Sequence, residues 1–203
     1  MNTLDQIVKR FGLNIEQESP IDINISRNAL GLLFAELGFT KGAEIGTERG
    51  IYSEVLLKAN PKLTLYCVDP WKAYKEYREH TTQSKIDEIY KEAIERLKPY
   101  NCCIIRKFSD KAYQDFPDGS LDFVYIDGNH DFTHVSEDLR NWTPKVRSGG
   151  IVAGHDFATF YGRYGQYNQV KKAVLKFVEE NHISPFFRIN NPNERPSWMW
   201  VKK

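Results

Sequence analysis

Four polar residues lie at or shortly after the ends of two apolar runs that the sequence predicts to be strands. Asp127 follows the first run, His130 comes three residues later, and His155 and Asp156 follow the second run. The two runs are residues 121–126 and 150–153. If these strands are neighbours in a parallel sheet, their carboxyl ends meet at one edge, and the four side chains meet there too. Carboxylates and imidazoles so placed can hold a metal ion or move a proton.

These residues allow two kinds of chemistry. Asp127, His155 and Asp156 form a candidate set of metal ligands, and a bound divalent ion would lower the pKa of a hydroxyl group that must lose its proton. His130 is a candidate general base, because an unperturbed imidazole has a pKa of about 6.5. The alternative for His130 is a loop histidine that bonds to backbone. His155 is open between ligand and base.

A second candidate site is the segment Glu44-x-Gly46-x-x-x-Gly50, with Thr47 inside it, between a predicted strand and a predicted helix. Glycines there let the backbone approach a ligand, and free amides at a helix N-terminus attract an anion such as a carboxylate. Taken alone, the pattern also fits a tight turn. Asp69 ends the next strand, where a carboxylate can accept both hydroxyls of a ribose. The acid Glu44 would repel a pyrophosphate and attract an amino group or a sulfonium.

Strand and helix predictions alternate along the chain, which indicates an α/β fold with a mostly parallel sheet. A helix is expected from Ser26 to Gly38, a second from about Gly50 to Ala59, a long helical region over 71–97, and one after Asn168. The strands are expected at 43–46, 63–68, 102–106, 121–126, 150–153, 186–189 and 198–201. The last two are joined by a turn too short for a crossover helix, so they should form an antiparallel hairpin. A seven-stranded sheet closed by a hairpin is typical of the methyltransferase variant of the Rossmann-like fold.

The bulk properties predict one domain over residues 1–203, with a helical N-terminal extension over 1–40 and a catalytic core over 41–203. The formal net charge of +1 offers no field for nucleic acid, so no nucleic-acid partner is expected. Neither a signal peptide nor a membrane-spanning run is visible, which predicts a cytoplasmic protein. Cys67, Cys102 and Cys103 are expected to be reduced and buried. A homodimer is left open.

The chain resembles the class I S-adenosylmethionine-dependent methyltransferases, in particular the small-molecule group similar to macrocin-type sugar O-methyltransferases. The resemblance spans about residues 43–157. Its most specific motifs are Ala-Glu-Ile-Gly at 43–46, Val-Asp-Pro-Trp at 68–71, Asp-Phe-Val-Tyr-Ile-Asp-Gly-Asn-His at 122–130 and Gly-Gly-Ile-Val-Ala-Gly-His-Asp at 149–156.

The resemblance implies roles for the residues of both candidate sites. The methionyl end of the cofactor would bind at the loop that begins with Glu44, the ribose at Asp69, and the adenine edge at Ser109 and Asp110. Trp71 would cover the adenine or line the pocket, with a plain packing role as the alternative. For Ser109 the alternative is a helix cap. The full set of expected cofactor contacts is Glu44, Gly46, Thr47, Gly50, Asp69, Trp71, Ser109, Asp110 and Asp127.

The resemblance also bears on the metal. Relatives that depend on a metal use oxygen ligands at the positions of Asp127, His155 and Asp156, which suits Mg²⁺. The imidazole of His155 shifts the preference toward Mn²⁺ or another transition ion, or else His155 is not a ligand and acts as a base.

The predicted function is the O-methylation of a small-molecule hydroxyl, such as that of a sugar. The aromatic and glycine-rich run 158–167, which includes Arg163, is expected to form a lid over this acceptor, with a packed surface loop as the alternative. A non-catalytic nucleoside-binding protein on the same fold is one rival. A metal-dependent phosphoesterase is another, because Gly-Asn-His-Asp occurs at 128–131, but the other motifs of that class are missing.

Overall fold

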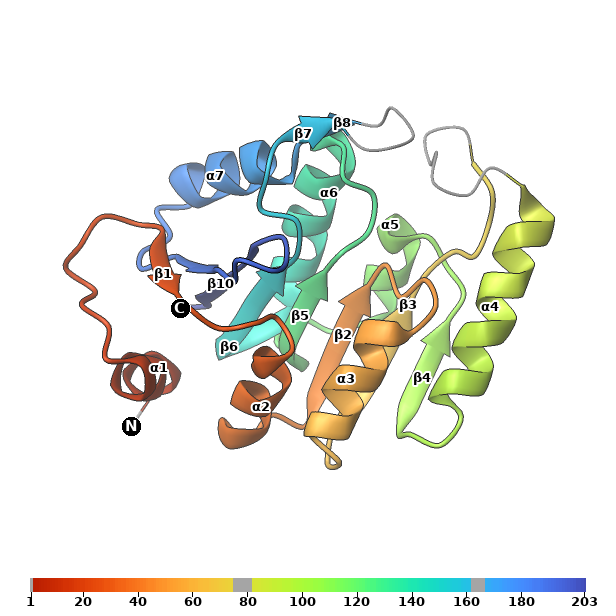
Figure 1. Ribbon diagram of the computed structural model, residues 1–203, viewed down its shortest axis with the longest axis horizontal. Coiled ribbons are helices and arrows are strands. Elements are labelled where there is room, and N and C mark those ends of the chain that lie inside the picture. Colours follow the sequence, from red (N-terminus) through yellow and green to blue (C-terminus); the bar gives the residue numbers. More distant parts are fainter. Residues whose placement is uncertain (1, 75–81, 162–166) are drawn as a thin grey trace.

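The computed structural model describes residues 2–74, 82–161 and 167–203. Within these ranges eight strands form one central sheet with the order β1-β9-β10-β6-β5-β2-β3-β4 (Figure 1). The strands are β1 (Ile21–Ile23), β2 (Lys41–Ile45), β3 (Thr64–Val68), β4 (Cys102–Ile105), β5 (Leu121–Ile126), β6 (Val146–Gly154), β9 (Phe187–Ile189) and β10 (Ser197–Val201). The helices are α1 (Thr3–Phe11), α2 (Ala29–Glu36), α3 (Ile51–Ala59), α4 (Gln83–Leu97), α5 (Ser109–Ala112), α6 (Phe132–Trp142) and α7 (Val170–Glu180).

The pairing of the strands confirms the predicted α/β class. The five strands from β6 to β4 pair in parallel, and β10 runs antiparallel to both β6 and β9. The predicted C-terminal hairpin is therefore present. The predicted number of strands was one too low, because Ile21–Ile23 adds β1 as a parallel neighbour of β9. The N-terminal segment is accordingly not wholly helical.

Apolar cores lie on both faces of the sheet. Phe123 and Tyr125 of β5 pack with residues of α2 and α3, whereas Val124 and Ile126 pack with residues of α6 and α7. Successive side chains of a strand point to opposite faces, so a strand covered on both sides is apolar throughout. Figure 1 shows α2 and α3 on one side of the sheet and α6 and α7 on the other.

Two helices begin later than predicted. The helix expected from Ser26 begins at Ala29, and the side chain of its N-cap residue, Asn28, makes no capping hydrogen bond. In the region 71–97, residues 71–74 are not helical and α4 begins at Gln83, where the Thr82 side chain accepts a hydrogen bond from the Lys85 amide. The part from 75 to 81 lies outside the described residues.

The cysteines only partly match their prediction. All three are free thiols, but only Cys67 is buried, Cys102 is half-buried and Cys103 is exposed. Cys102 and Cys103 lie on β4, which is the edge strand of the sheet, so an apolar neighbourhood in sequence did not guarantee burial.

The expected lid falls partly within the described residues. Phe160–Tyr161 (β7) and Tyr167–Asn168 (β8) pair as a short antiparallel ladder, and the rings of Tyr161 and Tyr167 stack at 4.7 Å. The residues between them, which include Arg163, lie outside the described residues. No helix in the described ranges is long and apolar enough to cross a membrane.

Backbone hydrogen bonds align the strand ends that carry the polar residues. The Asp127 amide donates to the Ile45 carbonyl at 2.7 Å, and the His155 amide donates to the Ile126 carbonyl at 3.0 Å. The Gly46 amide donates to the Val68 carbonyl at 2.8 Å. The ends of β2, β3, β5 and β6 are therefore held level, as the prediction of one shared edge requires.

Candidate active site

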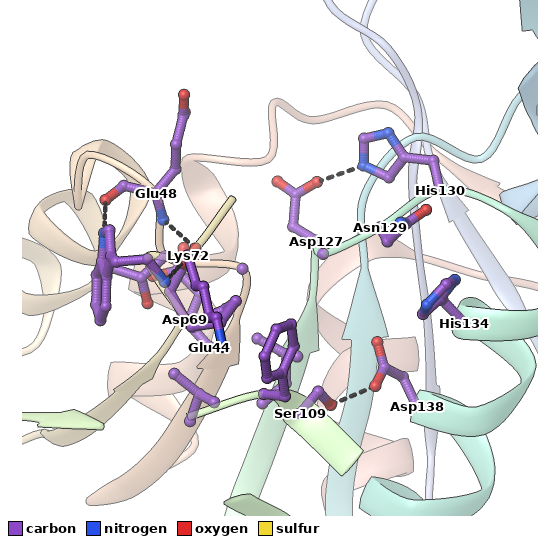
Figure 2. Close-up of a pocket in the computed structure, with 18 of the residues that line it drawn as sticks. Glu44, Glu48, Asp69, Lys72, Ser109, Asp127, Asn129, His130, His134 and Asp138 are labelled. Carbon is purple, nitrogen blue, oxygen red and sulfur yellow. Dashed lines mark hydrogen bonds and ion pairs between the residues drawn. The ribbon is translucent and has the colours of Figure 1, made fainter. Parts of the chain in front are cut away.

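A pocket of about 600 Å³ opens at the carboxyl ends of the parallel strands. Its wall includes Glu44 of β2, Asp69 after β3, Ser109 after β4 and Asp127 after β5. Ligands bind at this edge in open α/β sheets. Figure 2 shows these side chains around the common space, with His130 and Asp138 on the side of α6.

The turn after β2 requires its glycines. Gly46 has a φ of +92°, and a Cβ added there would overlap with the backbone carbonyl of Asp127. Gly50 has a φ of +70° and caps the N-terminus of α3. Both conformations disfavour a side chain. The lack of a Cβ lets the chain approach the end of β5 at Gly46 and makes room for Leu97 of α4 at Gly50. Gly46 and Thr47 line the pocket, and Gly50 lies between the lining residues Arg49 and Ile51. Their contact with a cofactor stays a prediction.

Glu44 is a buried acid at the wall of the pocket, 2% exposed, and its carboxyl accepts a hydrogen bond from the Ser53 hydroxyl. Burial raises the pKa of Glu44 to about 8, although the bond from Ser53 acts in the opposite direction. The carboxyl is thus largely neutral at pH 7, and an incoming cation would favour its ionised form.

Asp69 organises the next turn through backbone amides. Its Oδ2 accepts from the Glu48 amide at 3.0 Å, and its Oδ1 accepts from the Trp71 amide at 2.8 Å. Trp71 is buried, and its indole N–H donates to the Glu48 carbonyl at 2.8 Å. The ring also packs against Tyr90 at 4.9 Å. Trp71 therefore lines the pocket and packs at the same time, which combines the two alternatives considered for it.

Asp127, His130 and Asp156 form a compact cluster at the ends of β5 and β6. The Nε2 atom of His130 lies 3.5 Å from Asp127 Oδ1 and 3.5 Å from Asp156 Oδ2. One ligand atom from each of the three residues falls within 4.8 Å of the others, which is close enough to share a metal ion. Burial raises the pKa of Asp127, but the hydrogen bond from His130 and the positive charges nearby outweigh it, so the net shift is downward.

His155 lies beside this cluster, between Asp156 and Ser197. Its Nδ1 lies 3.0 Å from the Ser197 hydroxyl, and its Nε2 lies 3.9 Å from Asp156 Oδ1. Burial lowers the pKa of His155, which favours the neutral ring. The three residues that come together are thus Asp127, His130 and Asp156, whereas the sequence predicted His155 as the third ligand. A role of His155 in metal binding stays a prediction.

Two arginines that the sequence did not single out complete the cluster. Arg27, in the turn between β1 and α2, places its Nη1 atom 3.2 Å from Asp127 Oδ2 and stacks over the Tyr52 ring at 4.6 Å. Arg195, between β9 and β10, places its Nη1 atom 3.4 Å from Asp156 Oδ1. Neither lies in a motif, and both come from segments far from Asp127 in sequence, so no local pattern could have found them.

Ser109 does not cap its helix. Its hydroxyl accepts from the Trp142 indole N–H at 2.8 Å and donates to Asp138, a buried acid of α6. Asp138 was missed at the sequence level, although a signal existed. It shares the helical spacing of Val135, Leu139 and Trp142, and an acid on a core-facing stripe is unusual. Asp110 lines the pocket next to Ser109, where it was predicted.

With this geometry established, the chain can be placed among known proteins. A family model described as "Methyltransferase domain" matches residues 43–157, which is more than half of the chain. The chain belongs to this methyltransferase family, and the predicted class I methyltransferase fold is confirmed. Membership also removes support from the phosphoesterase alternative.

Individual relatives are distant. The uncharacterized protein y4gI of Sinorhizobium fredii is 27% identical over 119 residues, and the match covers 56% of this chain but 12% of that protein. The chain thus matches a small part of this curated relative.

Solved structures agree in fold. An O-methyltransferase from Bacillus cereus, in complex with SAH, is 16% identical with a TM-score of 0.61, covering 99% of this chain and 90% of the other. The O-methyltransferase TomG of Streptomyces achromogenes, in complex with SAM, is 16% identical with a TM-score of 0.60, covering 98% and 87%. At this identity the likeness supports the fold alone.

Proposed function

We propose that the chain is an S-adenosylmethionine-dependent O-methyltransferase that methylates a hydroxyl group of a small molecule, such as a sugar. The observation that carries the proposal is that one pocket contains both the glycine turn with Glu44 and the pair Asp127–His130. A methyl donor bound to the turn would therefore face a base in the same space. Family membership and SAM or SAH in the structural neighbours support this assignment.

The cofactor half of the site follows from charge and hydrogen bonding. The buried Glu44 carboxyl would face the amino group of the methionyl part, and the amides after Gly46 would face its carboxylate. Asp69 would accept the ribose hydroxyls, with its present bonds to the Glu48 and Trp71 amides fixing its orientation.

The transfer itself is an in-line displacement. The acceptor oxygen forms a bond to the methyl carbon as the bond from sulfur to that carbon breaks, which leaves S-adenosylhomocysteine. The hydroxyl proton would pass to Nε2 of His130, which Asp127 and Asp156 hold in place and stabilise when it becomes positive. Arg27 keeps Asp127 ionised and oriented for this role.

The proposal includes a divalent metal ion, Mg²⁺ or Mn²⁺, at the same cluster. The donor set fits one, since Asp127 and Asp156 offer carboxylate oxygens. The imidazole nitrogen would come from His155, because a His130 Nε2 atom bound to the ion could not also accept the hydroxyl proton. When bound, such an ion would lower the pKa of the acceptor hydroxyl. A single domain over 1–203 and a cytoplasmic location stay predictions, and a homodimer stays open.

The test is calorimetry with S-adenosylmethionine and S-adenosylhomocysteine, in the presence of chelator and then of Mg²⁺ or Mn²⁺. The wild type should bind both ligands. Asp69→Ala should weaken binding about tenfold or more, because a hydrogen bond to a charged group is lost. Asp127→Ala should retain cofactor affinity and lose turnover by at least about a hundredfold, or lose metal binding.

The outcomes separate the parts of the proposal. A folded wild type that binds neither ligand would remove the cofactor assignment. An Asp127→Ala variant that stays active on an identified acceptor would refute the catalytic role alone. If chelator changes neither binding nor turnover, the proposed metal requirement is refuted.

A further inference from the structure

A buried carboxyl on α6 forms part of the pocket wall away from the Asp127 cluster. Asp138 is 6% exposed and lies on the same helical face as Val135, Leu139 and Trp142, which are all buried. An acid in such a place is costly unless it is bonded. Its side chain nevertheless borders the open space of the pocket.

A chain of hydrogen bonds fixes which oxygen of Asp138 faces the pocket. The Trp142 indole can only donate, and it donates to the Ser109 oxygen at 2.8 Å. The Ser109 hydrogen is therefore available for Asp138 Oδ1, which accepts it. Oδ1 is thus an engaged acceptor, and Oδ2 is the oxygen that remains for a ligand.

The surroundings of Oδ2 are open. Among residues 2–74, 82–161 and 167–203, none donates a hydrogen bond to it. A Cβ added to Gly128 would lie 3.7 Å from Oδ2, so the glycine leaves free space beside this oxygen. Figure 2 shows the Asp138 carboxyl next to Ser109, with Asn129 and His134 nearby.

The same corner offers flat surfaces. Phe108 lines it, and Tyr74 packs on Phe108 edge-on at 5.4 Å while its hydroxyl accepts from the Asn129 amide at 3.4 Å. A planar ring with one polar edge suits a space with an aromatic wall and a single free acceptor. A purine with an exocyclic amino group has that shape.

We propose that Asp138 recognises the adenine of the cofactor by accepting a hydrogen bond from its 6-amino group through Oδ2. This inference rests on the proposed function, and it moves the base contact from Ser109 to Asp138, because the Ser109 hydroxyl is already used to hold the acid. Asp138 then acts as a specificity-determining residue for the amino group of the base.

The ionisation of Asp138 makes the proposed contact depend on pH. Burial raises the pKa of Asp138 to about 7, against the bond from Ser109 and the positive charge of His134, while Glu137 and Asp110 add to the rise. Tyr74 also interacts with Asp138, and its pKa is raised to about 12, so it stays neutral. The ionised acid accepts from an amino group, whereas the protonated acid would donate to an oxo group.

The experiment compares S-adenosylhomocysteine with its 6-oxo counterpart, S-inosylhomocysteine, by calorimetry from pH 6 to pH 8. Both ligands carry the same homocysteine part, so the titration of Glu44 affects them equally and cancels in the ratio of affinities. The wild type should prefer the amino ligand, and the preference should rise about tenfold or more between pH 6 and pH 8 as Asp138 ionises.

The variant Asp138→Asn sharpens the test. If its Oδ1 keeps the bond from Ser109, its Nδ2 replaces Oδ2 and turns an acceptor into a donor. The preference should therefore move toward the 6-oxo ligand and lose its pH dependence. The matched control is Glu137→Gln, which removes the same charge from the neighbouring residue. It should keep the preference for the amino ligand and its rise with pH, with the rise moved to lower pH because Glu137 helps to raise the pKa of Asp138.

Each result decides between the proposals. A wild-type ratio that does not change with pH, or falls as pH rises, overturns the role of Asp138, as does an Asp138→Asn variant with the wild-type preference. The pH profile of the wild type requires no variant, so the test holds if Asp138→Asn fails to fold. A wild type that binds neither ligand contradicts the cofactor assignment instead.

Discussion

The two halves of the pocket are built in different ways. The cofactor half consists of one continuous turn after β2, its glycines, the buried acid Glu44 and the acid Asp69, which backbone amides hold. The acceptor half consists of side chains from four segments, with Asp127 and Asp156 paired to Arg27 and Arg195. Backbone positions one half and ion pairs position the other. We therefore expect the first to tolerate almost no change of shape and the second to respond to changes of charge.

The variant Gly46→Ala should break the cofactor half most severely. A Cβ at this position would overlap with the Asp127 carbonyl, and the φ of +92° is strained for alanine. We expect a loss of about 3 kcal/mol or more in the free energy of unfolding. Urea denaturation measures it. Gly128→Ala is the matched control, because a Cβ there meets nothing closer than 3.7 Å, and equal losses for the two variants would contradict this account.

The variant Glu44→Gln changes the charge of the cofactor half while keeping the shape of the side chain. The pKa of Glu44 is raised to about 8 in the folded chain, from a reference value of 4.5. Between these values the unfolded chain is ionised while the folded chain holds a proton, so wild-type stability falls as pH rises through this window. Glu44→Gln keeps the bond from Ser53 and has no proton to lose. The stability of the variant relative to wild type should therefore grow by about 1 kcal/mol per pH unit from pH 5 to pH 8. A constant difference across this range would show that Glu44 is not buried in a neutral form.

Of the three variants, Arg27→Met should change the free energy of unfolding least. Its main effect should be on the pKa of Asp127. The Arg27–Asp127 pair is about one-fifth exposed, so its loss should cost about 1 kcal/mol. The pKa of Asp127 should rise, because Arg27 is one of the charges that lower it, and carboxyl NMR titration measures the shift. Arg10→Met, which breaks the exposed pair with Glu36, is the control and should leave Asp127 unchanged. No shift in the Asp127 pKa would mean that the ion pair does not order the acceptor half.

The same contrast explains what the sequence could reveal. The turn from Glu44 to Gly50 and the acids at strand ends were visible, because local spacing and strand periodicity determine them. Arg27 and Arg195 were not, since each acts through a partner that only the folded chain brings near. Asp138 could have been found as an acid on a core-facing stripe, but its bond to Ser109 could not. The strand β1 was missed for a related reason. Three residues carry too short a pattern, and their pairing partner lies more than 160 residues away.

That long separation also constrains the order of assembly. Arg27 follows β1, which pairs with β9, and its backbone amide donates to Glu194 in the segment between β9 and β10. Contacts between such distant positions form late and slowly, because closing the intervening loop costs entropy before any contact compensates for it. During synthesis the core strands from β2 to β6 can associate first, whereas the guanidinium reaches Asp127 only after β9 has left the ribosome. The nascent chain would thus acquire the parallel part of its sheet before the ion pair between Arg27 and Asp127.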